Sequence, residues 1–137
     1  MKTVDETEIE ILGEEGARLY ATFGAAIEGM RLRIARDGVS TALELDGEET
    51  ARLRDFLDER VPRGRATRDG SLEFEGEDAS LVFYPDNMGE PYRSGLTASV
   101  RSERRGSRWI FIENRQAEML KRFVAERAPS AAPAPGR

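Results

Sequence analysis

The chain contains neither cysteine nor histidine among its 137 residues. Without thiols or imidazoles it has no disulfide, no Ser-His triad, no cysteine nucleophile and none of the commonest zinc ligands. The acidic residues of the first predicted helix lack the spacing of a calcium-binding loop. These absences predict a non-enzymatic protein with no metal site and no cofactor. Chemistry based on carboxylates alone is the catalytic class that they leave open.

Long apolar runs are also missing. No segment approaches the roughly 20 apolar residues that a membrane-spanning helix needs. Met1-Lys2-Thr3 leads into acidic residues rather than into the apolar region of a signal peptide. We therefore expect a cytoplasmic protein with no membrane partner.

Lysine is scarce: Lys2 and Lys121 are the only two, and the other nineteen basic residues are arginines. The net charge of −5 is unevenly spread, because residues 1–62 carry fifteen acids and eight bases (−7), whereas residues 63–137 carry eleven acids and thirteen bases (+2). A uniformly acidic protein is poorly suited to nucleic acid. The uneven distribution leaves that function open for the second half.

An internal duplication is the most informative feature that is present. Leu53–Arg60 is followed sixty-seven residues later by the similar Leu120–Arg127, and Ile9–Glu15 resembles Leu72–Asp78 upstream. Roughly 60 residues would be marginal as a separate domain, so the copies should share a core or dimerise. We predict a first unit (residues 1–62) and a second unit (63–127) in one intertwined domain. The Ala/Pro-rich residues 128–137 are expected to be disordered.

Hydrophobic periodicity predicts four strands and then one helix in each unit. In the first unit the expected strands are 8–12, 17–23, 30–34 and 40–45, with a hairpin turn at Asp37-Gly38. Asp46 and Glu49 fit a capping box that begins a helix ending near Arg60. In the second unit the expected elements are strands 71–75, 79–84, 95–102 and 108–113 and a helix over 115–127. The predicted fold class is α+β: two tandem ββββα repeats, each a curved antiparallel sheet covered by one helix.

This organisation resembles the PUR domains, the purine-rich-element-binding family, and the related Whirly proteins. Arg18-Leu19-Tyr20, the segment 29–34 and the strand-to-helix passage 43–57 carry the resemblance, which extends as a pattern over roughly residues 8–127. It implies that the chain binds single-stranded DNA or RNA. PUR repeats usually carry several lysines on the sheet, and this chain has almost none. Because the first unit is acidic, a binding face is expected mainly in the second.

The last strands of the two units differ on the face that points away from the helix. Aligning Leu43 with Ile110 places Trp109 and Phe111 where the first unit has Ala42 and Glu44. Aromatic rings beside arginines suit unpaired bases, because each stacked base contributes about 1–3 kcal/mol and guanidinium groups meet phosphates. The predicted nucleic-acid-binding residues of the second unit are Tyr84, Arg101, Arg104, Arg105, Arg108, Trp109 and Phe111.

The first unit is expected to add Tyr20, Arg31 and Arg33 from the outer face of its second and third strands. The alternative for these residues is a solvated face with cross-strand pairs to Glu44. Trp109 and Phe111 could equally pack against the first unit or close a homodimer interface. Two functions therefore remain open: a single-stranded DNA- or RNA-binding protein, and a protein-interaction or homodimerisation module that retains the fold.

Overall fold

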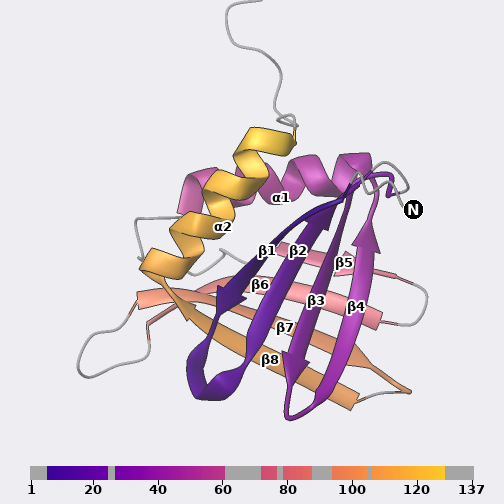
Figure 1. The fold of residues 1–137 in the computed structure, drawn as a ribbon, viewed down its shortest axis with the longest axis vertical. Coiled ribbons are helices and arrows are strands. Elements are labelled where there is room, and N and C mark those ends of the chain that lie inside the picture. The colour runs from indigo at the N-terminus through magenta and orange to yellow at the C-terminus, as the bar shows by residue number, and fades with distance from the viewer. Residues whose placement is uncertain are drawn as a thin grey trace, which may run out of the picture.

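The structure, a computed structural model, describes residues 6–24, 27–60, 72–76, 79–87, 94–104 and 106–128. It contains two four-stranded antiparallel sheets, each with its strands in chain order and each followed by a helix (Figure 1). The first unit comprises β1 (Thr7–Leu12), the 3-10 turn η1 (Glu14–Gly16), β2 (Arg18–Phe23), β3 (Met30–Arg36), β4 (Val39–Leu45) and α1 (Gly47–Arg60). The second comprises β5 (Leu72–Glu75), β6 (Ala79–Asn87), β7 (Ser94–Ser102), β8 (Gly106–Glu113) and α2 (Asn114–Arg127).

The predicted α+β class and the two ββββα units are confirmed. Asp37 and Gly38 both have positive φ, 55° and 79°, as the two-residue turn of a hairpin requires. The capping box is also present: the Glu49 N–H donates to Asp46 Oδ1 at 2.8 Å, and the Asp46 N–H donates to Glu49 Oε1 at 3.0 Å. The expected disordered tail, apart from Ala128, lies outside the described residues.

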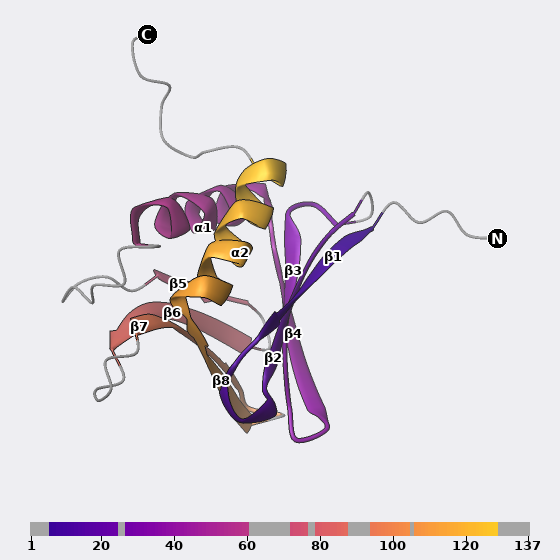
Figure 2. The same ribbon diagram turned by 60° about the vertical axis from the view of Figure 1, so that its left-hand side comes forward.

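Both sheets and both helices contribute to one apolar core. Figure 2 shows the two helices lying in the angle between the two sheets. Strand alternation decides which side chains enter this core: Leu19, Leu32 and Ile34 point inward from β2 and β3, while the residues between them point outward. Among the described residues, no helix is long and apolar enough to cross a membrane.

Each helix packs an aromatic ring against the sheet of the other unit. The Phe56 ring of α1 lies 6.2 Å from the ring of Phe83 in β6, and the Phe123 ring of α2 lies 5.7 Å from that of Phe23 in β2. Offset rings at this separation attract one another beyond simple burial. Because each helix contacts the sheet of the other unit as well as its own, the two units are interdependent.

Reciprocal contacts, of the kind that an approximate two-fold relation between the units would produce, also join them. Gly13 packs against the side chain of Ile110, and the corresponding Gly76 packs against Leu43, the equivalent of Ile110. Arg108 and Thr41 are equivalent positions too, and Arg108 Nη1 donates to Thr41 Oγ1 at 2.9 Å. Equivalent residues that contact each other lie near the axis that relates their units.

Candidate nucleic-acid interface

The outer face of the first sheet, which points away from the core, carries Tyr20 and Arg33 as predicted. They are cross-strand partners, and the Arg33 guanidinium lies 4.1 Å from the centre of the Tyr20 ring. The Tyr20 hydroxyl donates to Glu10 Oε2 at 3.1 Å. This hydrogen bond is the main reason that the pKa of Tyr20 is raised; Arg33 and Arg18 partly oppose the shift. Tyr20 is thus contacted by Arg33 at its ring and by Glu10 at its hydroxyl.

Arg31 lies on the same outer face, and it pairs with Glu44 across the strands, with Nε and Oε2 3.4 Å apart. This is the cross-strand alternative that the sequence allowed for Arg31. Arg18 is similarly paired with Glu10 at 3.1 Å. The strand residues of this face carry three carboxylates and three guanidinium groups: Glu8, Glu10, Glu44, Arg18, Arg31 and Arg33. The outer face of the first sheet is therefore charge-balanced rather than a continuous cationic surface.

Part of the outer face of the second sheet is buried. The strand register puts Tyr84, Thr97 and Phe111 in one row, as the alternation predicted. Phe111, however, is only 1% exposed and Thr97 only 3%. The ring of Phe111 is therefore not available to a ligand in this structure, which alternation alone could not reveal because it does not say what covers a face. The side chain of Tyr84 lies outside the described residues.

Trp109 marks the open part of this face, and its side chain is 42% exposed. The Arg36 guanidinium lies 4.7 Å from the centre of the indole, and Arg36 Nη1 donates to the Trp109 carbonyl oxygen at 3.2 Å. Arg36 Nη2 forms an ion pair of 2.6 Å with Glu15 Oε1. We call Trp109, Arg36 and Glu15 the Trp109 cluster. The sequence did not point to Arg36 or Glu15, which come from the first unit.

Arg101 is a diagonal neighbour of Trp109 across β7 and β8, and Arg104 lies in the turn that joins these two strands. Both are exposed, and neither forms a hydrogen bond or an ion pair within the described part of the chain. They border a polar hollow of about 390 Å³, which we call the Arg101 hollow. Its lining residues are Glu75, Gly76, Ala79, Ser80, Arg101, Glu103 and Arg104. Arg105, the remaining predicted residue of this turn, lies outside the described residues.

Arg108 does not belong to this surface. It alternates with Trp109 along β8, and its register partner Val100 is a core residue. Its hydrogen bond to the buried Thr41 joins the two sheets. The prediction that Arg108 contributes to the outer face is therefore corrected: strand parity directs it toward the junction of the two units.

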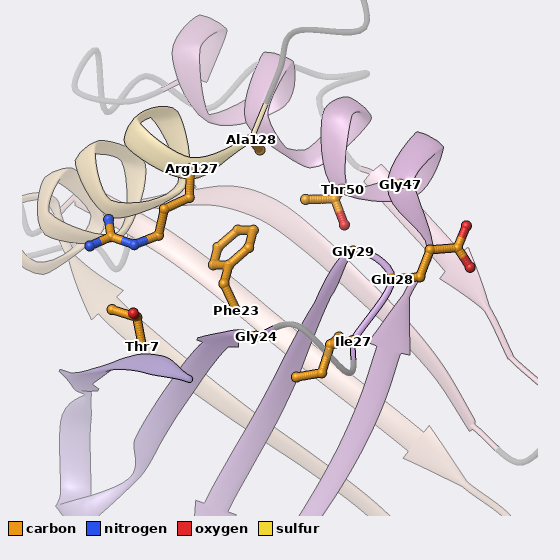
Figure 3. Close-up of a pocket in the computed structure, with 10 residues that line it drawn as sticks. All are labelled: Thr7, Phe23, Gly24, Ile27, Glu28, Gly29, Gly47, Thr50, Arg127 and Ala128. Atoms are coloured by element: carbon orange, nitrogen blue, oxygen red, sulfur yellow. The ribbon is translucent and has the colours of Figure 1, made fainter. Parts of the chain in front are cut away.

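A second hollow, of about 520 Å³, lies where the end of the first sheet meets both helices (Figure 3). Figure 3 shows the ring of Phe23 between Arg127 of α2 and Thr50 of α1. Two of the polar side chains there are engaged locally. Thr50 Oγ1 donates to the Asp46 carbonyl oxygen at 2.7 Å, and Arg127 Nη1 donates to the Phe123 carbonyl oxygen at 3.0 Å. Thr7 and Glu28 complete the polar side chains of its lining.

Among the residues that the structure describes, no three carboxylates come together in a way that could hold a metal ion. The chain matches no protein-family model and has no significant match among curated proteins.

Proposed function

We propose that the chain is a single-stranded nucleic-acid-binding protein and that its contact surface is the Trp109 end of the second sheet. The observation that carries this proposal is an exposed indole held in place by Arg36. Beside it, Arg101 and Arg104 are exposed guanidinium groups without partners in the described residues. A flat ring next to such cations combines base stacking with attraction to phosphate.

The platform holds one base rather than a run of bases. The Arg36 guanidinium covers one face of the Trp109 indole, so a base has the opposite face to stack on. Phe111 is buried and adds no second ring. One stacked base contributes about 1–3 kcal/mol, and every base has a face to stack, so we expect modest affinity and weak sequence preference.

The test uses the only tryptophan of the chain as its reporter. Titration with a single-stranded oligonucleotide should quench Trp109 fluorescence. The affinity should fall between about 50 and about 200 mM salt, because the release of counterions from the nucleic acid on binding is less favourable at higher salt. With a labelled oligonucleotide, Trp109→Ala should weaken binding about five- to 150-fold, which corresponds to the loss of one stack. Met119→Ala is the matched control, because Met119 is 40% exposed on α2, outside the proposed surface. Absence of binding at low salt would end the proposal.

A protein-interaction or homodimerisation module is the second candidate. The exposed ring of Trp109 favours it, because exposed aromatic side chains mark protein interfaces in general. In this case Trp109 would be buried in the interface. Light scattering after size exclusion separates the two functions: a Trp109→Ala variant that loses oligomer mass but keeps its oligonucleotide affinity would favour the module.

A further inference from the structure

We propose that the Arg101 hollow is a seat for one phosphodiester group, lined by Arg101, Ser80 and Arg104, with Ser107 next to Arg101 on the neighbouring strand. This inference rests on the proposed function, because the phosphate would belong to the strand whose base stacks on Trp109. One phosphate of the nucleic-acid backbone would lie at Arg101 and carry a single negative charge. The contact surface would then bind one nucleotide, with its base on Trp109 and its phosphate at Arg101.

The neighbours of Arg101 distinguish it from the arginines of the first sheet. Arg101 lies opposite Ser80 on β6 and opposite Ser107 on β8. Directly opposed residues have Cβ atoms about 4.5–5.5 Å apart, so both hydroxyls lie beside the start of the Arg101 side chain. In the first sheet, by contrast, Arg18 and Arg31 are neutralised by carboxylates. An arginine with serine neighbours on both adjoining strands offers guanidinium and hydroxyl donors, the groups that contact phosphate oxygens.

The two carboxylates of the hollow decide which kind of phosphate fits. Glu75 belongs to β5, two strands from Arg101, which places the two backbones about 10 Å apart. Glu103 lies in the turn between Arg101 and Arg104, and neither carboxylate pairs with an arginine of the hollow in the described residues. Two nearby negative charges oppose a doubly charged phosphate more strongly than a singly charged one. The seat therefore favours a diester within a strand over inorganic phosphate or a terminal phosphate.

The distance between the seat and the ring matches one nucleotide. Trp109 lies opposite Ser99 on β7, and Arg101 is two residues farther along the same strand and on the same face. Such diagonal neighbours are about 7–8 Å apart, which one nucleotide bridges between its base and an adjacent phosphate. A base stacked on Trp109 consequently brings its own backbone to Arg101.

The salt dependence of binding tests the seat. Arg101→Gln should make the slope of log affinity against log salt shallower by about 0.7, the value for one phosphate contact with a single strand. Arg115→Gln is the matched control, since Arg115 is an exposed arginine of α2 outside the hollow, and its slope should equal that of the parent protein. If the parent quenches Trp109 on binding but Arg101→Gln keeps the parental slope, the seat is overturned while the proposed function stands. If the parent does not bind, the proposed function fails first.

Backbone chemistry tests the choice of ligand. In a short oligonucleotide, single phosphodiesters can be replaced in turn by uncharged methylphosphonates. At one linkage this replacement should weaken binding by the parent protein and leave binding by Arg101→Gln unchanged. Equal weakening of both proteins at every linkage would overturn the seat. Inorganic phosphate, added at constant ionic strength, should displace the oligonucleotide no better than chloride does. Specific displacement by phosphate would overturn the preference for a diester.

Discussion

Arg36 and Trp109 belong to different units of the duplication, yet the guanidinium of one lies 4.7 Å from the ring centre of the other. The Arg36 side chain is only 15% exposed, and Glu15 holds its far side. Glu15 has a φ of 60°, in the left-handed region that non-glycine residues seldom adopt. The first unit therefore supplies the groups that set the orientation of the exposed ring of the second.

Replacing Arg36 by Met should release that ring. The substitution keeps much of the apolar stem and removes the cation–π contact, the ion pair to Glu15 and the hydrogen bond to the Trp109 carbonyl. We expect a loss of about 1–2 kcal/mol of unfolding free energy. Trp109 fluorescence anisotropy should fall because the indole gains freedom. Both quantities are measurable on one sample, by denaturant titration and by steady-state anisotropy.

Arg33→Met is the matched control for this prediction. Arg33 also stacks on an aromatic ring, but its partner is Tyr20 on the other sheet. Its removal should leave the anisotropy of Trp109 unchanged. Equal anisotropy in Arg36→Met and the parent protein would show that Arg36 does not orient the ring.

Two glycines at the contact between the units should differ in their tolerance of alanine. A Cβ at Gly13 would collide with the Ile110 side chain, and it would also lie 3.1 Å from the Phe111 carbonyl oxygen. A Cβ at Gly76 would lie farther from its neighbours, 2.9 Å from Cδ1 of Leu43, the movable end of a flexible side chain, and 3.2 Å from the Ala79 carbonyl oxygen. Gly13→Ala should therefore cost about 1–3 kcal/mol, as overpacking does, and Gly76→Ala less. Thermal unfolding measures both.

Gly47→Ala provides the comparison for these glycines. Gly47 begins α1, and a Cβ there would meet no atom within 4 Å. Alanine has the higher helix propensity, so this variant should be neutral or more stable by up to about 1 kcal/mol. A Gly13→Ala variant as stable as Gly47→Ala would contradict the close approach of η1 and β8.

The sequence was sufficient to predict the fold but only part of the site. Duplicated periodicity, Asp37-Gly38 and the Asp46–Glu49 capping box are local signals, and local signals specify strands, turns and helix starts. Alternation also assigned Trp109 and Phe111 to the same face correctly. It could not reveal that Phe111 is buried, because the burial of a sheet face depends on the tertiary arrangement.

The contribution of Arg36 was beyond sequence reasoning for a different reason. It lies seventy-three positions from Trp109 and immediately before a turn, where an arginine usually faces solvent. Only the packing of the two sheets brings it to the indole. The pairing of Arg31 with Glu44, in contrast, follows from strand register and was anticipated as an alternative.

Tyr20 should ionise later than an ordinary tyrosine. Its pKa is raised above 10.0, chiefly because its hydroxyl donates to Glu10 and the neutral phenol is thereby favoured. The folded state then holds this proton more tightly than the unfolded state. The stabilisation is fully present below about pH 10 and is lost as the pH rises through the pKa of the folded protein. The difference in tyrosinate absorbance between the parent and Tyr20→Phe measures this titration.

Glu10→Gln should lower the pKa of Tyr20, since it removes both the charged acceptor and its repulsion of the phenolate. Glu8→Gln is the control, because Glu8 accepts a hydrogen bond from Thr22 rather than from Tyr20. If the two variants titrate alike, the Glu10 hydrogen bond is not the cause of the shift.

Truncation of Phe123 should destabilise the first unit as well as the second. Phe123 is 7% exposed and packs on Phe23 of the first sheet, so Phe123→Ala should cost about 3–5 kcal/mol, a large share of the stability of a small domain. Phe56→Ala should act in the same way through Phe83. Met119→Ala changes an exposed residue of the same helix and should cost much less.

The packing of each helix on both sheets makes this loss cooperative. Trp109 fluorescence reports the unfolding of the second unit. The difference between the near-ultraviolet spectra of the parent and Tyr20→Phe reports the unfolding of the first. In Phe123→Ala, both signals should shift to the same lower denaturant midpoint. The reason is that α2 packs on both sheets, so a weakened α2 weakens the core of each. Two separate midpoints would mean that the units unfold independently and that the packing of α2 on the first sheet does not couple them.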